Sequence, residues 1–422
     1  MKYNIIDLKE GIKLHTIKTD KFKTNLVAIF LTTKLNRENV TKNALISMIL
    51  RRGSKNMTSQ EEISKKMEEM YGASFDCGLD KTGDNQVLKF YVESINDNFL
   101  PKQGENNLKK SIENIIEIVF NPYIENESFK KEYIEQEKKN LKQKIEGKID
   151  NKARYAMDRC IEEMYKDEPF GLFKFGYVED LENIDEKNLY DYYKELIDSC
   201  KIDIFVSGNV DDETIDIINK NETIKSITSR NPNYVVTGLI KKDRKEEKIV
   251  LESMDVTQGK LLLGLDVNIN EEKLKYDVLI YNSILGGSAN SKMFQNVREK
   301  AHLAYVASSS YLRHKNNIFI NCGIEIANYE KALELIRKQI DDMKNGNFTD
   351  KDIEDAKTGI IATVKTIGDE QDTEVSYYFG QELSQSKTSV EEYISKVESV
   401  TKESIINVAD KISINTIYFL KD

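Results

Sequence analysis

The chain has 422 residues, more than one hydrophobic core normally supports, so we expect two or more domains. Charged residues make up 32% and hydrophobic residues 39%, a balance typical of globular proteins rather than of membrane-spanning or disordered ones. The 62 basic and 72 acidic side chains give a net charge of −10, which argues against a nucleic-acid partner.

The cysteines and the N-terminus bear on the cellular compartment. Cys77, Cys160, Cys200 and Cys322 stand far apart and form no C-x-x-C pair, which favours reduced thiols over a disulfide framework. Charges interrupt the opening MKYNIIDLKEGIKL before a signal-type apolar run can build, and no stretch approaches the ~18 apolar residues of a transmembrane helix. We therefore expect a cytoplasmic protein without a membrane partner.

The first half of the chain has the pattern of an α+β protein. Two strand-like pieces, residues 11–18 and 24–35, open it and are expected to pair as a hairpin. Apolar spacing, N-cap residues and glycine or proline stops then predict helices and a second hairpin, before a buried strand closes the half. These elements are helices at 42–50, 58–72, 106–119 and 127–165, the last with a break at Gly147, a hairpin at 74–92 and a strand at 201–211. This order predicts an antiparallel-rich sheet packed with helices.

The second half repeats this order. GKLLLGLDV at 259–267 resembles the earlier TNLVAIFL, and the helix that ends at Gly287-Ser288 resembles the one that ends at Gly53-Ser54. The final NTIYFLKD resembles KIDIFVSGNV. A duplication of about half the chain explains these matches together, although any α+β chain offers some of them by chance. The predicted domains are an N-terminal one at 1–218, a linker at 219–240 and a homologous C-terminal one at 241–422.

The stretch LGGSANSKMFQNVREKAHLAY, residues 285–305, is the strongest candidate for a binding site. It joins two apolar, helix-like segments through a polar turn. Gly286, Gly287 and Ser288 in this turn would let backbone N–H and C=O groups come close to a ligand.

Two polar side chains follow that turn. Arg298 and Tyr305 would both project near it, and a guanidinium with a phenol suits a carbonyl or carboxylate group. Spacing alone leaves another interpretation open. Arg298 could form a surface ion pair with Glu299, and Tyr305 could be an ordinary strand aromatic.

Three motifs are similar to those of the pitrilysin/insulinase (M16) family of zinc peptidases, also called the mitochondrial processing peptidase family. They are ISKKMEEMYGASFD at 63–76, FVSGNVD at 205–211 and GGSANSKMFQNVREKAHLAY at 286–305, and the resemblance covers essentially the whole chain. It implies two homologous α/β halves of the LuxS/metallohydrolase-like, mitochondrial-processing-peptidase type. One departure lies inside the third motif, where the family most often has Gly and this chain has His302.

The family's zinc motif is degenerate in this chain. In active members, H-x-x-E-H on the first helix supplies two histidine ligands and a general base, and a downstream glutamate completes the site. By this resemblance Ala44 and Met48 stand at the histidine positions and Ser47 at the catalytic glutamate. Glu137 matches a family glutamate, which places Lys144 at the downstream ligand. Ala, Met and Lys do not bind Zn²⁺ usefully at neutral pH, so we expect no metal or other cofactor in this chain.

The resemblance therefore implies a non-catalytic, pseudo-peptidase subunit. In heterodimeric members one subunit carries the zinc, and the other lacks it but contributes the Arg and Tyr that hold the substrate carbonyl. By that resemblance Arg298 would orient the peptide backbone, and Tyr305 would donate to the developing oxyanion. Gly286, Gly287 and Ser288 would let the loop approach the substrate.

The same resemblance sets the expected partners. They are a zinc-bearing M16 peptidase subunit and a peptide substrate. The combination of features resembles the bacterial YfmF-like subgroup, whose members are accompanied by such a sister subunit.

Two other classes of protein stay open. One is a homodimeric peptide-binding protein that acts without any peptidase, and the other is a structural subunit such as the respiratory-complex core subunits that share this fold. A neighbouring gene with an intact H-x-x-E-H would favour the heterodimeric enzyme. Catalysis through another metal or a cysteine nucleophile finds no support, because His15, His302 and His314 are scattered and no cysteine is near them in sequence.

Overall fold

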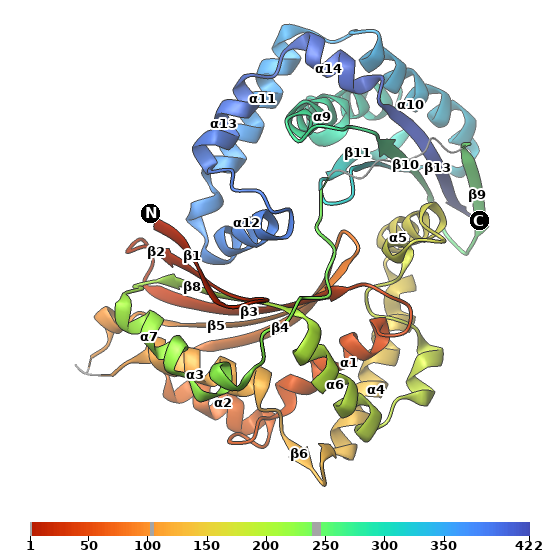
Figure 1. Cartoon of the computed structure of the whole chain (residues 1–422). Helices are drawn as coiled ribbons and strands as arrows, with labels where there is room; N and C mark the ends of the chain where they lie inside the picture. The colour runs from red at the N-terminus through yellow and green to blue at the C-terminus, as the bar shows by residue number, and fades with distance from the viewer. Residues whose placement is uncertain (1, 102–104, 239–245) are drawn as a thin grey trace. The chain divides into compact units, whose positions relative to one another are not determined.

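The computed structural model describes residues 2–101, 105–238 and 246–422, which form two compact units (Figure 1). The first unit consists of Met1–Glu146, Leu172–Val235 and Gln371–Phe379. The second consists of Gly147–Gly171, Val236–Glu370 and Gly380–Asp422. Each unit contains one large, mostly antiparallel sheet with helices packed on it, which confirms the predicted α+β class.

The sheet of the first unit has six strands in the order β1-β2-β8-β3-β5-β4. Neighbouring strands are antiparallel except β2 and β8, which are parallel. The strands are β1 (Lys2–Lys9), β2 (Ile12–Lys18), β3 (Thr24–Lys34), β4 (Ser74–Thr82), β5 (Asn85–Ile95) and β8 (Lys201–Gly208). A separate two-stranded ribbon is formed by β6 (Ile124–Glu125) and β7 (Ser128–Phe129). Every residue of β8 is buried, as expected for a central strand.

The sheet of the second unit repeats this topology with five strands in the order β11-β12-β10-β13-β9. Its one parallel pair, β13 with β9, corresponds to β8 with β2, and all its other pairs are antiparallel. The strands are β9 (Lys248–Ser253), β10 (Gly259–Val267), β11 (Ala304–Leu312), β12 (Asn317–Ile324) and β13 (Ile412–Lys421). The shared strand order and directions confirm that the two halves are alike in fold. The first sheet has one strand more, because β1 pairs with the outer edge of β2.

The expected hairpin between the first two predicted strands is wrong. In the structure β8 lies between β2 and β3 and pairs with both of them. The chain therefore brings a strand from beyond residue 200 into the middle of its first sheet. Sequence proximity favours a hairpin, but the apolar side chains of β8 can be buried on both faces only at the centre of the sheet.

One face of the first sheet carries a layer of helices (Figure 1). N-cap side chains begin several of them: Ser59 accepts from the Glu62 N–H, and Asp185 and Asp211 each form a capping box. The helices of this unit are α1 (Val40–Ile49), α2 (Gln60–Glu69), α3 (Asn107–Phe120), α4 (Lys131–Glu146), α6 (Glu186–Ser199), α7 (Asp212–Lys220) and α8 (Glu222–Ser226).

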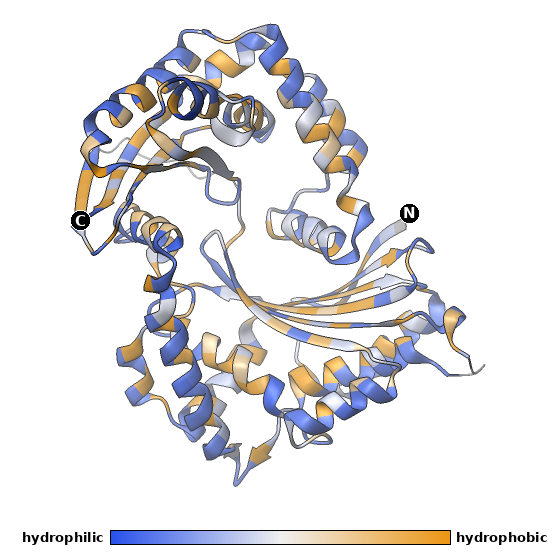
Figure 2. Cartoon of the chain, turned by 180° about the vertical axis from the view of Figure 1, so that it is seen from behind, coloured by the Kyte–Doolittle hydropathy of each residue, from blue (hydrophilic) through white to orange (hydrophobic). Residues whose placement is uncertain are grey.

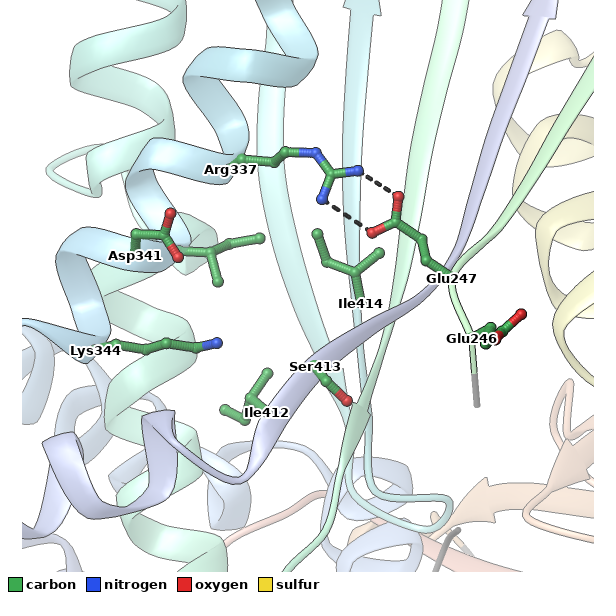
Figure 3. Close-up of a pocket in the computed structure, with 9 residues that line it drawn as sticks. Glu246, Glu247, Arg337, Asp341, Lys344, Ile412, Ser413 and Ile414 are labelled. Atoms are coloured by element: carbon green, nitrogen blue, oxygen red, sulfur yellow. Dashed lines mark hydrogen bonds and ion pairs between the residues drawn. The ribbon is translucent and has the colours of Figure 1, made fainter. Parts of the chain in front are cut away.

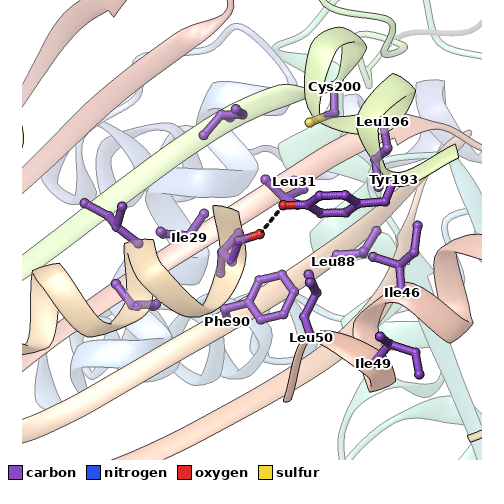
Figure 4. Packing of buried hydrophobic residues seen from close by; sticks show 14 of the residues in the cluster. Ile29, Leu31, Ile46, Ile49, Leu50, Leu88, Phe90, Tyr193, Leu196 and Cys200 are labelled. Atoms are coloured by element: carbon purple, nitrogen blue, oxygen red, sulfur yellow. Dashed lines mark hydrogen bonds between the residues drawn. The ribbon is translucent and has the colours of Figure 1, made fainter. Parts of the chain in front are cut away.

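The main hydrophobic core lies between this helix layer and the sheet (Figure 4). Strand residues such as Ile29 and Phe90 meet Ile46 of α1 and Leu196 of α6, and all four are buried. Tyr193 also lies in this core, and its hydroxyl donates to the Val119 carbonyl oxygen at 2.8 Å. The cluster is built from buried apolar side chains, and the Tyr193 hydroxyl within it is paired, so this core holds α1 against the sheet.

The helices of the second unit come mostly from the C-terminal part of the chain. They are α5 (Lys152–Met164), α9 (Leu274–Asn282), α10 (Tyr329–Lys344), α11 (Asp350–Lys365), α13 (Val390–Glu398) and α14 (Lys402–Ala409), while α12 (Gln371–Leu383) is divided between the two units. Helices α9, α10 and α14 lie on one face of the second sheet (Figure 1). Within the described ranges, no helix is both long and apolar enough to cross a membrane.

Each sheet has its other face covered by a helix from the opposite half of the sequence. Helix α5 packs Cys160 and Met164 against Leu262 and Tyr418 of the second sheet. Residues 371–379 of α12 belong in turn to the first unit. The ring centroids of Phe379 and Phe30 are 4.5 Å apart there, and Gln371 donates to the Ser207 carbonyl oxygen at 3.0 Å.

The compact units are therefore discontinuous in sequence, unlike the predicted domains at 1–218 and 241–422. Those boundaries describe the duplicated halves, and they stay a prediction. Residues 239–240 of the predicted linker and the first five residues of the predicted C-terminal domain lie outside the described ranges.

A buried charged cluster sits on the first sheet. Asp203 accepts a hydrogen bond from His15 Nε2 at 3.0 Å and pairs with the Lys201 ammonium, and all three side chains are buried. The other ring nitrogen of His15, Nδ1, lies 2.8 Å from the Tyr3 hydroxyl and is hydrogen-bonded to it. Burial opposes the ionisation of Asp203, but Lys201 and His15 outweigh it and lower the pKa of this carboxyl to about 2.

Candidate functional site

Helix α1 carries three of the four positions at which the resemblance places zinc chemistry. Ala44 is buried in the main core, and Met48 packs against the same core while partly exposed. Ser47 is also buried, and its hydroxyl donates to the Ala44 carbonyl oxygen at 2.7 Å. A hydroxyl that is bonded back to its own helix is not placed to activate water. The α1 positions thus serve packing.

Helix α4 carries the fourth position. Lys144 is exposed there, and its ammonium lies 4.2 Å from the ring centroid of Phe175. Glu137, two turns earlier, is buried and pairs with Arg52, while its second oxygen accepts from Asn140 at 3.1 Å. This carboxylate is therefore held by a guanidinium and an amide.

The donor set at these positions does not fit zinc. It contains no imidazole and no thiolate, and the one nearby carboxylate is paired with Arg52. Across the described ranges, no group of three or more His, Cys, Asp or Glu side chains is arranged to hold a metal ion. We derive no metal-dependent step in this chain.

The cysteines offer no nucleophile either. Burial raises the pKa of the Cys77 thiol to about 11, although the charges of Arg51 and Lys144 act in the opposite direction. Burial likewise raises the pKa of Cys160, Cys200 and Cys322 to about 12. A thiol that stays protonated at neutral pH is a poor nucleophile.

The glycine turn in the second unit is a packing device. Gly286 is the next-to-last residue of a π-helical segment, Ser283–Gly287, and a Cβ at this position would lie 2.6 Å from the backbone nitrogen and the hydroxyl oxygen of Ser309 on β11. Only glycine allows this close approach of helix and strand. Gly286 is buried, whereas Gly287 and Ser288 are exposed, so only the last two can meet a ligand.

Arg298 lies on a second π-helical segment, Met293–Lys300, in which Met293 and Val297 face the core. Its side chain is 43% exposed, and the guanidinium carbon lies 4.6 Å above the ring centroid of Phe294. Arg298 Nε is also 3.5 Å from a carboxylate oxygen of Glu299, as the ion-pair interpretation expected. An exposed pair of this kind is worth at most about 1 kcal/mol, so the guanidinium can change partner at low cost. Single π-helical turns occur often at functional sites.

Tyr305 lies at a β-bulge near the start of β11. The pairing of β11 with β12 shifts between Ala304 and Val306, so Tyr305 is the extra residue of the bulge. Its side chain is 63% exposed, more than any other large hydrophobic side chain described. Bulges commonly turn a side chain away from its regular direction, and here the phenol points to solvent at the outer edge of the sheet.

The turn that leads into this bulge contains His302, which stands where the family most often has glycine. His302 has a φ of 55°, a left-handed conformation that favours glycine. The Leu303 N–H donates to the Val297 carbonyl oxygen at 3.1 Å and closes the end of the helical segment. The chain therefore keeps the turn with a histidine at the position where the family most often has glycine.

The predicted site residues divide between the two units. Arg298, Tyr305 and the exposed end of the glycine turn all belong to the second unit, beside the edge strand β11, whereas α1 and α4 belong to the first. The sequence did not point to Phe294, which supports the guanidinium, or to Ser309, which requires Gly286. The one signal in the sequence was that Phe294 stands four residues before Arg298, a spacing that places two side chains on the same face of a helix.

A pocket of about 500 Å³ in the second unit is a weaker candidate (Figure 3). Two of its charged groups are already paired: Arg337 and Glu247 form a two-fold hydrogen-bonded ion pair, one bond of which measures 2.9 Å. Its wall begins at Glu246, directly after the residues that the structure does not describe. We assign no function to it.

Known proteins are similar to this chain in sequence or in fold. Residues 183–360 match the domain family described as Peptidase M16 inactive domain. A Bacillus subtilis protein named Probable inactive metalloprotease YmfF is 34% identical over 417 residues, which are 97% of this chain and 96% of that protein. A second B. subtilis protein, named Uncharacterized zinc protease YmxG, is 24% identical over 60% of this chain and 63% of its own length. The crystal structure of a conserved protein from Enterococcus faecalis V583 superposes with a TM-score of 0.91 at 28% identity and covers 100% of this chain and 99% of that one.

Proposed function

Because the chain belongs to the peptidase M16 family, as an inactive metalloprotease-like member, we propose that it is the non-catalytic subunit of a heterodimeric metallopeptidase. In this proposal it binds a peptide substrate and supplies Arg298 and Tyr305 to the active site of a zinc-bearing partner subunit. The observation that carries the proposal is a contrast between two sets of residues. The positions for zinc chemistry are packed or carry a lysine, whereas Arg298 and Tyr305 stay exposed beside an open sheet edge.

The edge strand β11 suits an extended peptide. It is the last strand of the second sheet, so one row of its backbone N–H and C=O groups has no strand partner among the described residues. A peptide can add to such an edge as a further strand, with main-chain hydrogen bonds giving affinity. The phenol of Tyr305 and the guanidinium of Arg298 then lie on the side from which the peptide arrives.

The two side chains would act through hydrogen bonds. The guanidinium of Arg298 donates to a peptide carbonyl and holds the backbone in place, and its stacking on Phe294 limits its freedom before binding. The Tyr305 hydroxyl donates to the oxygen that gains negative charge during cleavage, which stabilises the transition state more than the ground state. Zinc in the partner would supply the activated water.

The proposal predicts a defined companion. The tagged full-length chain, isolated from a soluble extract of its own organism, is expected to carry a similar amount of a chain that contains an intact H-x-x-E-H. That complex should contain zinc and cleave peptides. Recovery of this chain alone, without zinc and inert, would overturn the heterodimer and favour a homodimeric peptide-binding or structural protein.

The purified chain by itself is expected to contain far less than one zinc per chain, because its donor set lacks imidazole and free carboxylate. Elemental analysis after dialysis is the measurement. A matched variant that places His at Ala44 and Met48 and Glu at Ser47 and Lys144 should gain zinc while it stays a poor peptidase, since supporting residues around the metal are absent. One zinc per unmodified chain would contradict the interpretation of these positions.

A further inference from the structure

Strand β9 leaves the second sheet with an open edge that the first sheet does not have. In the first sheet the corresponding strand β2 is covered on its outer side by β1, which pairs with it antiparallel from Lys2 opposite Lys18 onward. In the second sheet β9 is the last strand, and within the described ranges no strand pairs with its outer side. The duplicated fold therefore shows that this position accepts a strand.

On one face of the sheet, the side chains of β9 are exposed. Most residues of β2 are buried, whereas Ile249 and Leu251 of β9 are 55% and 56% exposed. These two lie two residues apart and so share one face of the sheet, and Figure 2 shows β9 in the hydrophobic colour beside the C-terminus. Two neighbouring aliphatic side chains on an uncovered edge strand favour association with another strand.

The opposite face of β9 is already occupied. Glu252 accepts from Arg159 of α5 at 2.9 Å, and Lys248 pairs with Glu163 of α5 at 2.6 Å. Val250 packs against the cluster beneath α5. The conformation of β9 is thereby fixed before any partner arrives, which lowers the entropy cost of pairing.

We propose that β9 is a self-association surface, on which the β9 strand of a second copy of this chain pairs antiparallel about a two-fold axis at Val250. The sequence of the strand, KIVLES, selects this register. With Val250 opposite itself, Ile249 of one copy faces Leu251 of the other on the exposed side. Lys248 then lies opposite Glu252 of the second copy, so no like charges face each other at either end of the pair, and both side chains can keep their partners on α5.

Neighbouring registers fit less well. Residues directly opposite each other in an antiparallel pair lie on the same face, so the axis must pass through a residue pair. An axis at Leu251 would place Val250 opposite Glu252 and Ile249 opposite Ser253, which sets apolar side chains against polar ones. The register at Val250 alone matches all five positions, which is why the strand fits a copy of itself.

The contact is small. One strand pair buries less area than the roughly 1,200–2,000 Å² of a stable interface, so we expect self-association in the micromolar range. The inference does not depend on the proposed peptidase partner, because it uses none of the residues beside β11.

The test is sedimentation equilibrium of the full chain over roughly 1–100 μM. We expect a rise from one chain of 48.7 kDa to twice that mass. Ile249→Lys and Leu251→Glu, each made alone, should weaken self-association about tenfold or more, because each homodimer would bury two unpaired charges against aliphatic groups. Both positions are exposed, so the fold should tolerate either change.

The two variants also test the register. When they are mixed, residue 249 of one chain faces residue 251 of the other, so the heterodimer contains one Lys–Glu pair and one Leu–Ile pair. The mixture is therefore expected to regain association that neither variant shows alone. Ile5→Lys on β1, an exposed isoleucine on the edge of the other sheet, is the matched control and should leave the dimer unchanged.

Three results would overturn the proposal. They are a monomer at every concentration, a dimer that neither single variant weakens, and a mixture that fails to associate more strongly than its components.

Discussion

Arg298→Ala is expected to lower the peptidase turnover of the mixed complex by about 10- to 1,000-fold, the range found when a group that stabilises transition-state charge is removed. Tyr305→Phe should act in the same direction, because it removes only the hydroxyl that would donate to the oxyanion. Both side chains are exposed and outside the hydrophobic core, so neither change should affect folding. The measurement is kcat and KM of the reconstituted complex with one peptide substrate.

The control for Arg298 is Lys300→Ala. Lys300 is an exposed cation on the same π-helical segment and is expected to leave turnover unchanged. Co-purification of the partner with each variant separates a loss of catalysis from a loss of assembly. If turnover in Arg298→Ala and Tyr305→Phe equals that of the unmodified complex, these residues are inherited relics and the proposed supply of groups to the partner is wrong.

Asp203→Asn is expected to lower the free energy of unfolding by about 3 kcal/mol or more. The change leaves the ammonium of Lys201 in a buried site without its counter-charge, and removing one member of a buried ion pair is strongly destabilising. Urea unfolding of the full chain measures it. Asp191→Asn is the matched control, because Asp191 forms an exposed ion pair with Lys194 and its loss should leave the free energy of unfolding nearly unchanged.

The unmodified chain and the Asp203→Asn variant should also differ in how their stability depends on pH. The pKa of Asp203 is about 2 in the folded chain, below the ordinary aspartate value near 3.9. A depressed pKa means that the ionised carboxyl stabilises the fold above pH ~4, and this contribution, roughly 2 kcal/mol, is lost as the pH falls through about 2. The stability difference between the unmodified chain and Asp203→Asn should therefore shrink between pH 5 and pH 2. A difference that stays constant with pH would contradict the charged network.

Much of the fold was readable from local pattern. The strands at 24–34 and 259–267 end within one residue of the apolar runs that predicted them, and the strand at 201–208 ends three residues before its predicted end at 211. These strands are buried on both faces, so their sequences are largely apolar and easy to recognise. Strands β1 and β9 were missed, since KYNIIDLK and KIVLES mix charges with apolar residues at sheet edges. The false hairpin has the same origin: nothing local in β2 or β3 shows that β8 will lie between them.

The packing of α5 on the second sheet and of α12 on the first was not predictable from sequence for a related reason. An amphipathic pattern shows which face of a helix is apolar, but not which sheet that face will meet. The long helical stretch from 127 to 165 was expected with a break at Gly147, and the break is there, between α4 and α5. Only the three-dimensional structure shows that the two pieces join different units.

The candidate site divides in the same way. The loss of zinc chemistry follows from side-chain identity at Ala44, Met48 and Lys144, so the sequence was enough for that prediction. The bulge at Tyr305 and the left-handed backbone at His302 depend on how β11 pairs and how the preceding turn closes. Gly286 was expected to make room for a ligand, but the structure shows that it makes room for Ser309.

The exchanged helices also set the order in which the protein can be completed on the ribosome. Strand β8 closes the first sheet at Gly208, but the helix that covers its second face begins at Gln371, about 160 residues later. At synthesis rates of about 5–20 residues per second, roughly 10–35 s pass between the synthesis of Phe205 and that of Phe379, and Phe30 waits about twice as long. During that time Phe30 and Phe205 of the nascent first unit lack the contact with Phe379 that covers them in the finished protein. Truncation before residue 371 would make this lack of contact permanent.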